Sequence, residues 1–358
     1  MSRHSISSIG KLFMVAGLMV LFVIGATGFD LVNAAPKGKV HLVIHDPAMS
    51  RGYTKAWEWW AKEVTKQTNG EVTHEFLWGG PLGGFKEALD NLSNGVFDAC
   101  MIIPTYTPSK LPLWTAFEVP FLSSSMWAFN RALWDMKDVP VLKKEVEQWN
   151  VKVLIPIMPT SFELMSRKPL RNLADLKGLK TRAYGMFAEV LGHYGAQCVS
   201  IPSPQIYENM QRGVIDAAIL PWPDFFVNYG VYELSKYGLV LGGFGFIVAP
   251  FSINMDTWNK ISPENQEIMM KLARQAVDKN AEISASLAEP AMAKIKAKGI
   301  EVTYLAKNER DQMVAFAKTI WDSWVEKQEK AGRPEARMIM DTMVKKAKEY
   351  EKVDPFKK

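Results

Sequence analysis

Arg182 is the side chain of this sequence best suited to hold an anion. It ends a short strand-like run within Leu173–Gly185 (LADLKGLKTRAYG), after a polar, lysine-bearing turn. A guanidinium stays charged at any working pH and presents five donors in a fixed fork, which matches a carboxylate or a sulfonate. An ordinary strand arginine in a surface ion pair is the commoner interpretation of the spacing alone. Other features of the sequence are needed to distinguish an anion-binding arginine from one in a surface ion pair.

No catalytic or cofactor motif accompanies this arginine. The sequence has no G-x-S-x-G elbow, no HExxH motif and no cysteine–histidine signature, so an enzyme is not expected. The glycine-rich stretch 79–84 lacks the GK[ST] ending and the GxGxxG spacing of phosphate loops, which favours a plain turn. His41 and His45 are strand-like and have no cysteine nearby, so neither a metal nor another cofactor is predicted.

The N-terminus has the three parts of a secretory signal peptide. Arg3 and Lys11 give a positive start, and Val32–Ala34 offers a small-x-small cleavage pattern. The apolar run between them is about 17 residues, at the lower edge of what spans a bilayer, so an uncleaved anchor is the alternative. We expect residues 1–34 to be a signal peptide, cleaved near Ala34, and the protein to be periplasmic.

Composition narrows the class of partner. The formal net charge is +5, with acidic and basic residues interspersed and no basic tract with interleaved aromatics, so nucleic acid is not an expected partner. Cys100 and Cys198 are too few for a disulfide scaffold. Pairing between them is the alternative to two buried free thiols, which their apolar contexts favour.

A short sequence motif that occurs twice predicts two similar α/β lobes. Asn91–Ala99 (NLSNGVFDA) and Asn209–Ala217 (NMQRGVIDA) share the pattern N-x-x-x-G-V-x-D-A, after helix-like sequence and before an apolar strand. The glycine fits a left-handed helix cap. A helix–glycine–strand unit that recurs by chance explains so short a match as well as duplication does. Either origin implies α/β architecture.

Other elements should connect and cover these lobes. The stretches 153–163 and 242–250 are expected to cross between them as hinges. A helix should run from Pro263 to Glu289, roughly 40 Å at 1.5 Å per residue, and Pro290 should kink or end it. Further strands are expected over 40–45, 72–78 and 301–304, and helices over 54–67, 85–94 and 309–330.

Aromatic residues gather just past the strand that follows the second repeat. Trp222, Phe225 and Phe226 lie in the segment ILPWPDFFVNY beside two prolines. Ligands of open α/β sheets bind at the carboxyl ends of strands, where such rings can wall a small pocket. Core packing is an equal alternative for Trp222 and the favoured one for Phe226. Pro104–Tyr106 is the corresponding point of the first lobe.

The chain resembles the solute-binding proteins of TRAP (tripartite ATP-independent periplasmic) transporters, the dicarboxylate-binding-protein family. The resemblance follows the family order over nearly all of the chain beyond residue 34, in the segments GGPLGGFKEALDNLSNGVFDA, LPLWTAFEVPFL, RKPLRNLADLKGLKTRAYG, YENMQRGVIDAAILP, YELSKY and SINMDTWNKISPENQ. It implies an α/β, two-lobed periplasmic-binding-protein fold with hinge strands and a long helix spanning both lobes. Lobe 1 would comprise residues 35–158 and 248–288, and lobe 2 residues 159–247 and 289–358.

The resemblance also implies a ligand site between two lobes that close around it. The family's signature arginine falls on Arg182. The ligand-binding set that we predict is Arg182, Trp222, Tyr106, Tyr184, Asp46, Ser161, Ser203 and Phe225. A second arginine frequent in the family is replaced at or near Ser161, and Leu220 stands where asparagine is frequent, so Arg182 is expected to act alone.

These departures favour a small monoacid with an apolar or aromatic body, or a small sulfonate, over a long dicarboxylate. The resemblance implies capture of such an organic anion and its delivery to TRAP membrane permease subunits. The alternative is an ABC-type or sensor-linked binding protein. A monomer is expected, and Asp46, Glu163 and Asp224 leave open whether a metal ion bridges ligand and protein.

Overall fold

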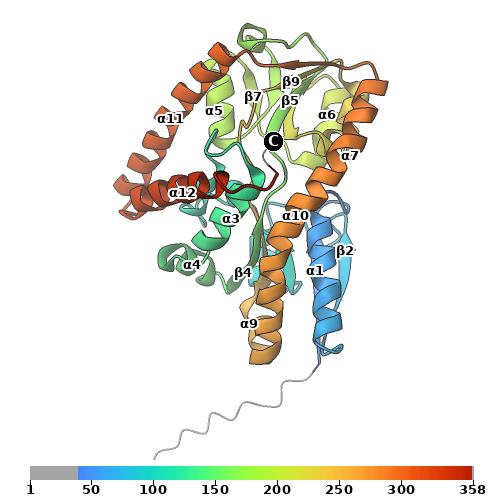
Figure 1. Ribbon diagram of the computed structural model, residues 1–358, viewed down its shortest axis with the longest axis vertical. Helices are drawn as coiled ribbons and strands as arrows, with labels where there is room; N and C mark the ends of the chain where they lie inside the picture. The colour runs from blue at the N-terminus through green and yellow to red at the C-terminus, as the bar shows by residue number, and fades with distance from the viewer. Residues whose placement is uncertain (1–38, 357–358) are drawn as a thin grey trace, which may run out of the picture. The chain divides into compact units, whose positions relative to one another are not determined.

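Two β-sheets with helices packed against them make up residues 39–356, the part of the chain that this computed structural model describes (Figure 1). The expected signal peptide and its cleavage site near Ala34 lie outside these residues. None of the helices described is long and apolar enough to cross a membrane.

The first sheet has five strands in the order β2-β1-β3-β10-β4. Strands β1, β2 and β3 are parallel, whereas β10 is antiparallel to both of its neighbours. The strand bounds are β1 Val40–Asp46, β2 Val72–Trp78, β3 Ala99–Met101, β4 Val151–Ile157 and β10 Ala249–Asn254. The helices in this part of the chain are α1 Thr54–Gln67, α2 Ala88–Ser93, α3 Met126–Met136, α4 Pro140–Glu147 and α9 Met255–Lys260.

The second sheet has six strands in the order β11-β9-β5-β8-β6-β7. Strand β5 is antiparallel to β8 and β9, and the other neighbouring pairs are parallel. The strand bounds are β5 Phe162–Ser166, β6 Lys180–Arg182, β7 Gln197–Val199, β8 Ala217–Pro221, β9 Tyr237–Val240 and β11 Glu301–Tyr304. The short helices here are α5 Gly185–His193, α6 Ile206–Gln211, α7 Asp224–Asn228 and α8 Val231–Leu234.

The chain crosses between the sheets at the two stretches expected from the sequence. Strand β4 of the first sheet leads to β5 of the second, and β9 leads back to β10. The backbone N–H of Phe162 donates to the Gly245 carbonyl at 2.7 Å, so the two crossings lie side by side.

Two buried carboxyl groups hold the second crossing. Glu163 accepts hydrogen bonds from the backbone N–H groups of Leu241 and Gly243, and Glu118 accepts one from Val248 at 3.1 Å. Burial raises the pKa of Glu163 to about 7 and that of Glu118 to about 8. Both carboxyl groups therefore hold protons at a pH where an exposed glutamate has lost its own.

The repeated motif has the same conformation in both copies. Gly95 follows α2 with φ +69°, Gly213 follows α6 with φ +75°, and each motif leads into a strand, β3 or β8. Both glycines are left-handed, as predicted for a helix cap.

Replacing Gly213 tests this cap without a steric clash, because an added Cβ would meet no atom closer than 4.0 Å. Gly213→Ala is expected to lower the free energy of unfolding by about 1–2 kcal/mol, the cost of a left-handed L-residue. Urea unfolding measures the change. Gly192→Ala within α5 is the matched control, since its φ is not left-handed and its Cβ also meets open space. Equal effects of the two substitutions would contradict the cap.

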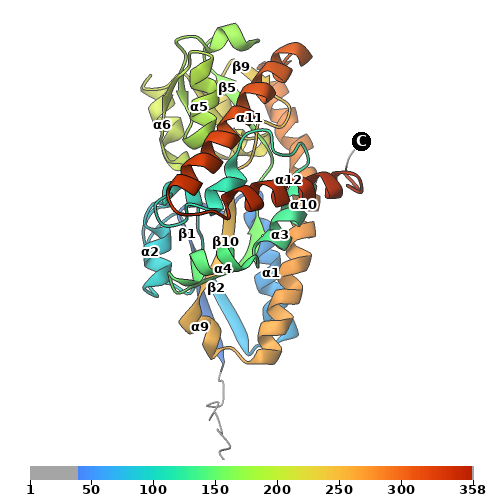
Figure 2. The same ribbon diagram turned by 90° about the vertical axis from the view of Figure 1, so that its left-hand side faces the viewer.

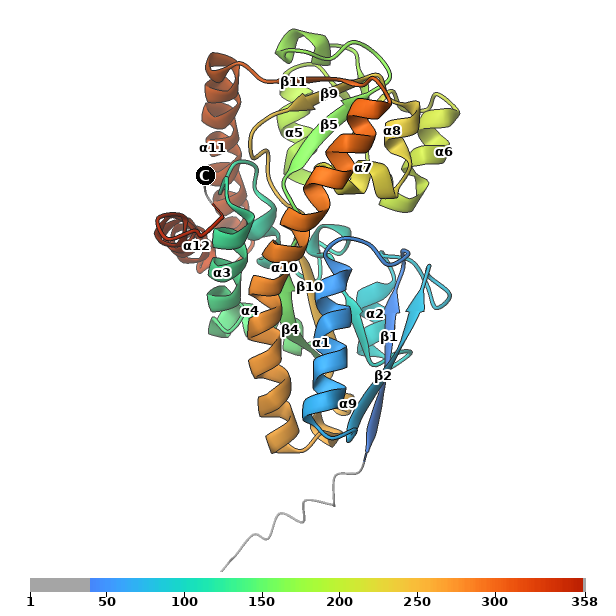
Figure 3. The same ribbon diagram turned by 45° about the vertical axis from the view of Figure 1, so that its right-hand side comes forward.

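The long helix α10 extends further than expected, over the 35 residues Pro263–Ala297. Ser262 caps its start by accepting from the Asn265 N–H at 3.2 Å. Of the two outcomes expected at Pro290, a kink or an end, the helix does not end there but continues to Ala297. Pro290 is exposed, so water can bond the carbonyl that a proline leaves free. The helix contacts both α1 and α7, beside the first and second sheets respectively (Figure 3).

Two helices end the described chain. Helix α11 spans Lys307–Lys330 and contacts α5, whereas α12 spans Ala336–Glu351 and lies against α3 (Figure 2). Asp135 of α3 accepts hydrogen bonds from Lys346 at 2.8 Å and from the Tyr350 hydroxyl at 3.0 Å. Residues 289–358, which were assigned from the sequence to lobe 2, thus include helix α12. This helix was not predicted, and it packs against α3 beside the first sheet.

Candidate ligand-binding site

Arg182 is the last residue of β6 and is fully buried. Its Nε donates to the Ile201 carbonyl at 2.8 Å and its Nη1 to the Ile219 carbonyl at 3.0 Å. Its Nη2 donates to the Ser203 hydroxyl at 3.2 Å and to the Tyr106 hydroxyl at 3.4 Å. All four acceptors are neutral oxygens.

The guanidinium of Arg182 therefore carries an uncompensated charge. Within residues 39–356 it forms no ion pair. A buried charge without a partner is costly, so an anion bound here would relieve that cost. The backbone bonds fix Nε and Nη1. The two longer bonds, at Nη2, go to hydroxyls of half-buried side chains that a carboxylate can displace.

Aromatic rings surround this guanidinium. The Arg182 Cζ lies 4.7 Å from the centroid of the Tyr184 ring, and the Tyr184 and Tyr106 centroids are 5.9 Å apart. The Tyr184 hydroxyl is buried and has no hydrogen-bond partner among the described residues. Burial raises its pKa well above the usual value. The phenol thus stays protonated and can donate to a polar group of a ligand.

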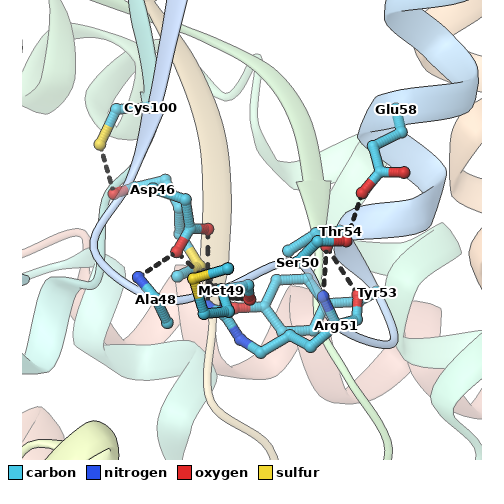
Figure 4. Close-up of polar contacts among 10 residues, drawn as sticks. Asp46, Ala48, Met49, Ser50, Arg51, Tyr53, Thr54, Glu58 and Cys100 are labelled. Carbon is cyan, nitrogen blue, oxygen red and sulfur yellow. Dashed lines mark hydrogen bonds and ion pairs between the residues drawn. The ribbon is translucent and has the colours of Figure 1, made fainter. Parts of the chain in front are cut away.

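A second buried arginine, Arg51, lies in the loop between β1 and α1 (Figure 4). Its Nη1 lies 3.0 Å from Oδ1 of Asp46, and its Nη2 donates to the Tyr53 hydroxyl at 2.8 Å. Asp46 also accepts from the Ala48 N–H at 2.8 Å. Burial raises the pKa of Asp46, and the charge of Arg51 opposes that shift. Unlike Arg182, Arg51 is thus neutralised by a bonded carboxylate.

Tyr53 connects this pair to the second sheet. Its ring stacks on that of Phe225 in α7, with centroids 5.5 Å apart and planes at 8°. The Phe225 ring in turn lies 5.9 Å from that of Tyr229. Burial raises the pKa of Tyr229, and the charges of Arg51 and Arg182 both lower it. The Tyr229 phenol therefore lies within the fields of both arginines.

Two of the predicted site residues point to other neighbours. The Trp222 ring packs against Gly238 of β9, where an added Cβ would lie 3.2 Å from it, and against Phe226. Because β9 and β6 lie on opposite sides of β8, this ring extends away from Arg182. The Ser161 hydroxyl accepts from the Gly245 N–H at 3.4 Å, within the paired crossings.

The structure thus divides the predicted set into groups. Arg182, Tyr106, Tyr184 and Ser203 meet directly. Asp46 and Phe225 belong to a second group, connected through Arg51, Tyr53 and Tyr229, which the sequence did not single out. Among residues 39–356, no group of three or more His, Cys, Asp or Glu side chains is arranged to hold a metal ion.

A cavity of about 730 Å³ adjoins this cluster. Tyr184 lines it from the second sheet, Thr105 and Glu118 line it from the segment after β3, and α11 borders it. Arg182 is not one of its lining residues, but its ring partner Tyr184 is. The Glu118 Oε2 is buried without a hydrogen-bond partner in the described chain. The cavity offers space for the body of a small molecule next to Tyr184, the ring partner of Arg182.

Comparison with known proteins identifies the family of the chain. Residues 45–328 match the model of the DctP family, "Bacterial extracellular solute-binding protein, family 7". The chain belongs to this family. The relationship predicted from the sequence is confirmed, and the family is one of solute-binding receptors that work outside the cytoplasm.

Curated relatives bind different solutes. The ectoine-binding periplasmic protein TeaA of Halomonas elongata is 23% identical over 304 residues, which are 80% of this chain and 88% of TeaA. A monocarboxylate 2-oxoacid-binding periplasmic protein of Nostoc sp. is 27% identical over 221 residues, 58% of each chain.

Solved structures confirm the two-lobed binding-protein fold. A TRAP solute-binding protein from Rhodoferax ferrireducens in complex with copurified benzoate superposes with a TM-score of 0.80 at 23% identity, covering 88% of this chain and 99% of that chain. A marine-metagenome TRAP protein specific for aromatic acid ligands, crystallised with 3-hydroxybenzoate, gives 0.79 at 23% identity, covering 88% and 99%.

Proposed function

We propose that this solute-binding protein captures a small organic anion between two closing lobes and delivers it to TRAP membrane permease subunits. The observation that carries the proposal is Arg182, a fully buried guanidinium bonded only to neutral oxygens. The aromatic rings of Tyr106 and Tyr184 beside it suit a carboxylate, above all an apolar or aromatic monoacid, or a sulfonate. The solutes named for the structural neighbours, benzoate and 3-hydroxybenzoate, are of this kind.

The expected mechanism is capture without chemistry on the solute. In an open form, Arg182 and Ser203 face water on one lobe, and Tyr106 stays on the other. The solute carboxylate takes the place of the hydroxyls at Nη2, and closure then excludes water and strengthens the charge-assisted bonds. The solute leaves unchanged when the permease reopens the lobes.

Export and assembly state belong to the same proposal. Periplasmic relatives and the signal-like sequence of residues 1–34 support cleavage near Ala34 and a periplasmic location. The mature protein acts as a monomer in this account. Mass spectrometry of the exported chain and size-exclusion chromatography test the two points.

An ABC-type or sensor-linked partner would use the same closing lobes. Membrane subunits of one small and one large type encoded beside this chain favour TRAP, whereas an adjacent ATPase would favour ABC. The TRAP proteins among the structural neighbours support a TRAP permease as the partner.

A thermal-shift screen of organic acids and sulfonates tests the proposal. An acid present at 100 times its dissociation constant should add about 2.7 kcal/mol to the free energy of unfolding, because it binds only the folded protein. Uncharged amides of the same acids are the control and should give no shift. If no acid or sulfonate stabilises the protein, the proposal is wrong.

A further inference from the structure

A second buried arginine stands close to the proposed site, although the sequence suggests that Arg182 acts alone. Arg51 is 5% exposed, and its Nε is buried without a hydrogen-bond partner in the described chain. It belongs to the loop after β1 of the first sheet, whereas Arg182 ends β6 of the second sheet. If both guanidinium groups were uncompensated, the site would suit a dianion.

Aromatic side chains place the two arginines around one shared region. The Arg51 Cζ lies 5.9 Å from the centroid of the Phe85 ring, which lies 6.0 Å from the ring of Tyr106. The Tyr106 hydroxyl accepts from Arg182 at 3.4 Å. On the other side, the Tyr53 ring bonded to Arg51 stacks on Phe225, whose ring lies 5.9 Å from that of Tyr229.

The acids facing Arg51 differ in how they are held. Asp46 is 1% exposed and bonds both Nη atoms, at 3.0 and 3.5 Å. Asp224 lies close to Gly52, and its carboxyl is held by backbone N–H groups at the start of α7. Asp46 is therefore the bonded counter-charge of Arg51, whereas Asp224 is a neighbouring charge.

We propose that Asp46 sets the charge of the solute: by neutralising Arg51, it leaves Arg182 as the uncompensated member of this pair of buried arginines and selects monoanions over dianions. A second carboxylate entering beside the pair would meet the like charge of Asp46 and find no free guanidinium. This inference rests on the proposed capture of organic anions and names the residue that decides their class.

Calorimetry with two matched pairs of acids tests this role of Asp46. The probes are benzoate against isophthalate and propionate against succinate, each pair differing by one carboxylate. The wild-type protein should bind the monoanion of the better pair at least about tenfold more tightly than the dianion. Asp46→Asn, which keeps the shape and frees Arg51, should shift that ratio toward the dianion by about tenfold.

Asp224→Asn is the matched control, since it removes a buried negative charge near Arg51 without breaking the ion pair. It should leave the ratio within about twofold of the wild type. The double variant Asp46→Asn/Arg51→Gln removes both charges of the pair and should keep the preference for monoanions. It provides a test if Asp46→Asn alone does not fold.

Three results would overturn the inference. They are equal binding of mono- and dianion by the wild type, an unchanged ratio in Asp46→Asn, and loss of the preference in the double variant. In each of these, anion capture itself stands. If the wild type binds no acid of either pair or of the wider screen, the proposed function fails as well.

Discussion

Arg182→Ala is expected to remove most of the affinity for the organic acid found in the screen. The substitution deletes the uncompensated guanidinium and leaves the solute carboxylate buried without a charged partner. Truncating one member of a buried, hydrogen-bonded charge pair costs about 2–5 kcal/mol, which weakens binding by at least about 30-fold. Isothermal calorimetry measures the change.

Two further variants show whether this loss belongs to the fork of Arg182. Arg182→Lys keeps the charge but lacks the planar donors, so its affinity should lie between those of wild type and Arg182→Ala. Arg171→Ala removes an arginine of the same part of the chain that is exposed and paired with Glu301, and binding should not change. Unchanged affinity in Arg182→Ala would exclude this residue from the site.

The free energy of unfolding is expected to fall as pH rises from about 5 to 8, chiefly through Glu118. Burial raises the pKa of Glu118 from 4.5 to about 8, and that of Glu163 to about 7. Between the unfolded and the folded pKa, the folded protein holds a proton that the unfolded chain has released. Stability is thus highest near or below pH 4.5 for these groups and is lost as pH rises through the folded values. Each unit of pKa difference corresponds to about 1.4 kcal/mol.

Urea unfolding at pH 5 and pH 8 checks this dependence. Glu118→Gln keeps an acceptor for the Val248 N–H and removes the titration, so its stability should change less between the two pH values than that of the wild type. Glu289→Gln on α10, an exposed position, is the control and should follow the wild type. Two results would contradict this role of Glu118. One is a free energy of unfolding of the wild type that rises from pH 5 to pH 8, and the other is the same pH dependence in Glu118→Gln as in the wild type.

Local sequence patterns located many elements because local physics determines them. Helix α1 and strand β2 begin and end at the predicted residues, since Trp57, Trp60 and Val64 form an apolar stripe of helical period that is buried. The helix caps at Gly95 and Gly213 were also predictable, because glycine adopts the left-handed conformation that such a cap requires. Whether the helix ends at Pro290 could not be decided from the sequence, because the cost of a proline depends on its exposure in the folded helix.

The site was harder to predict because its contacts join distant segments. Arg182 was proposed first from its residue type and position, and the resemblance to the family then supported it and suggested its neighbours. Arg51 was missed, although it lies five residues from Asp46, because nothing in the loop sequence shows that both side chains turn inward. For Trp222 the sequence left a pocket wall and core packing as equal alternatives, and its packing against Gly238 across the sheet sets the direction of its ring.

The most direct test of anion capture by Arg182 is a crystal structure of the protein with the organic acid that stabilises it most. The carboxylate or sulfonate oxygens should lie within about 3 Å of the Arg182 guanidinium, in place of its Tyr106 or Ser203 bond at Nη2. A ligand bound elsewhere, with Arg182 still bonded only to neutral protein oxygens, would contradict it.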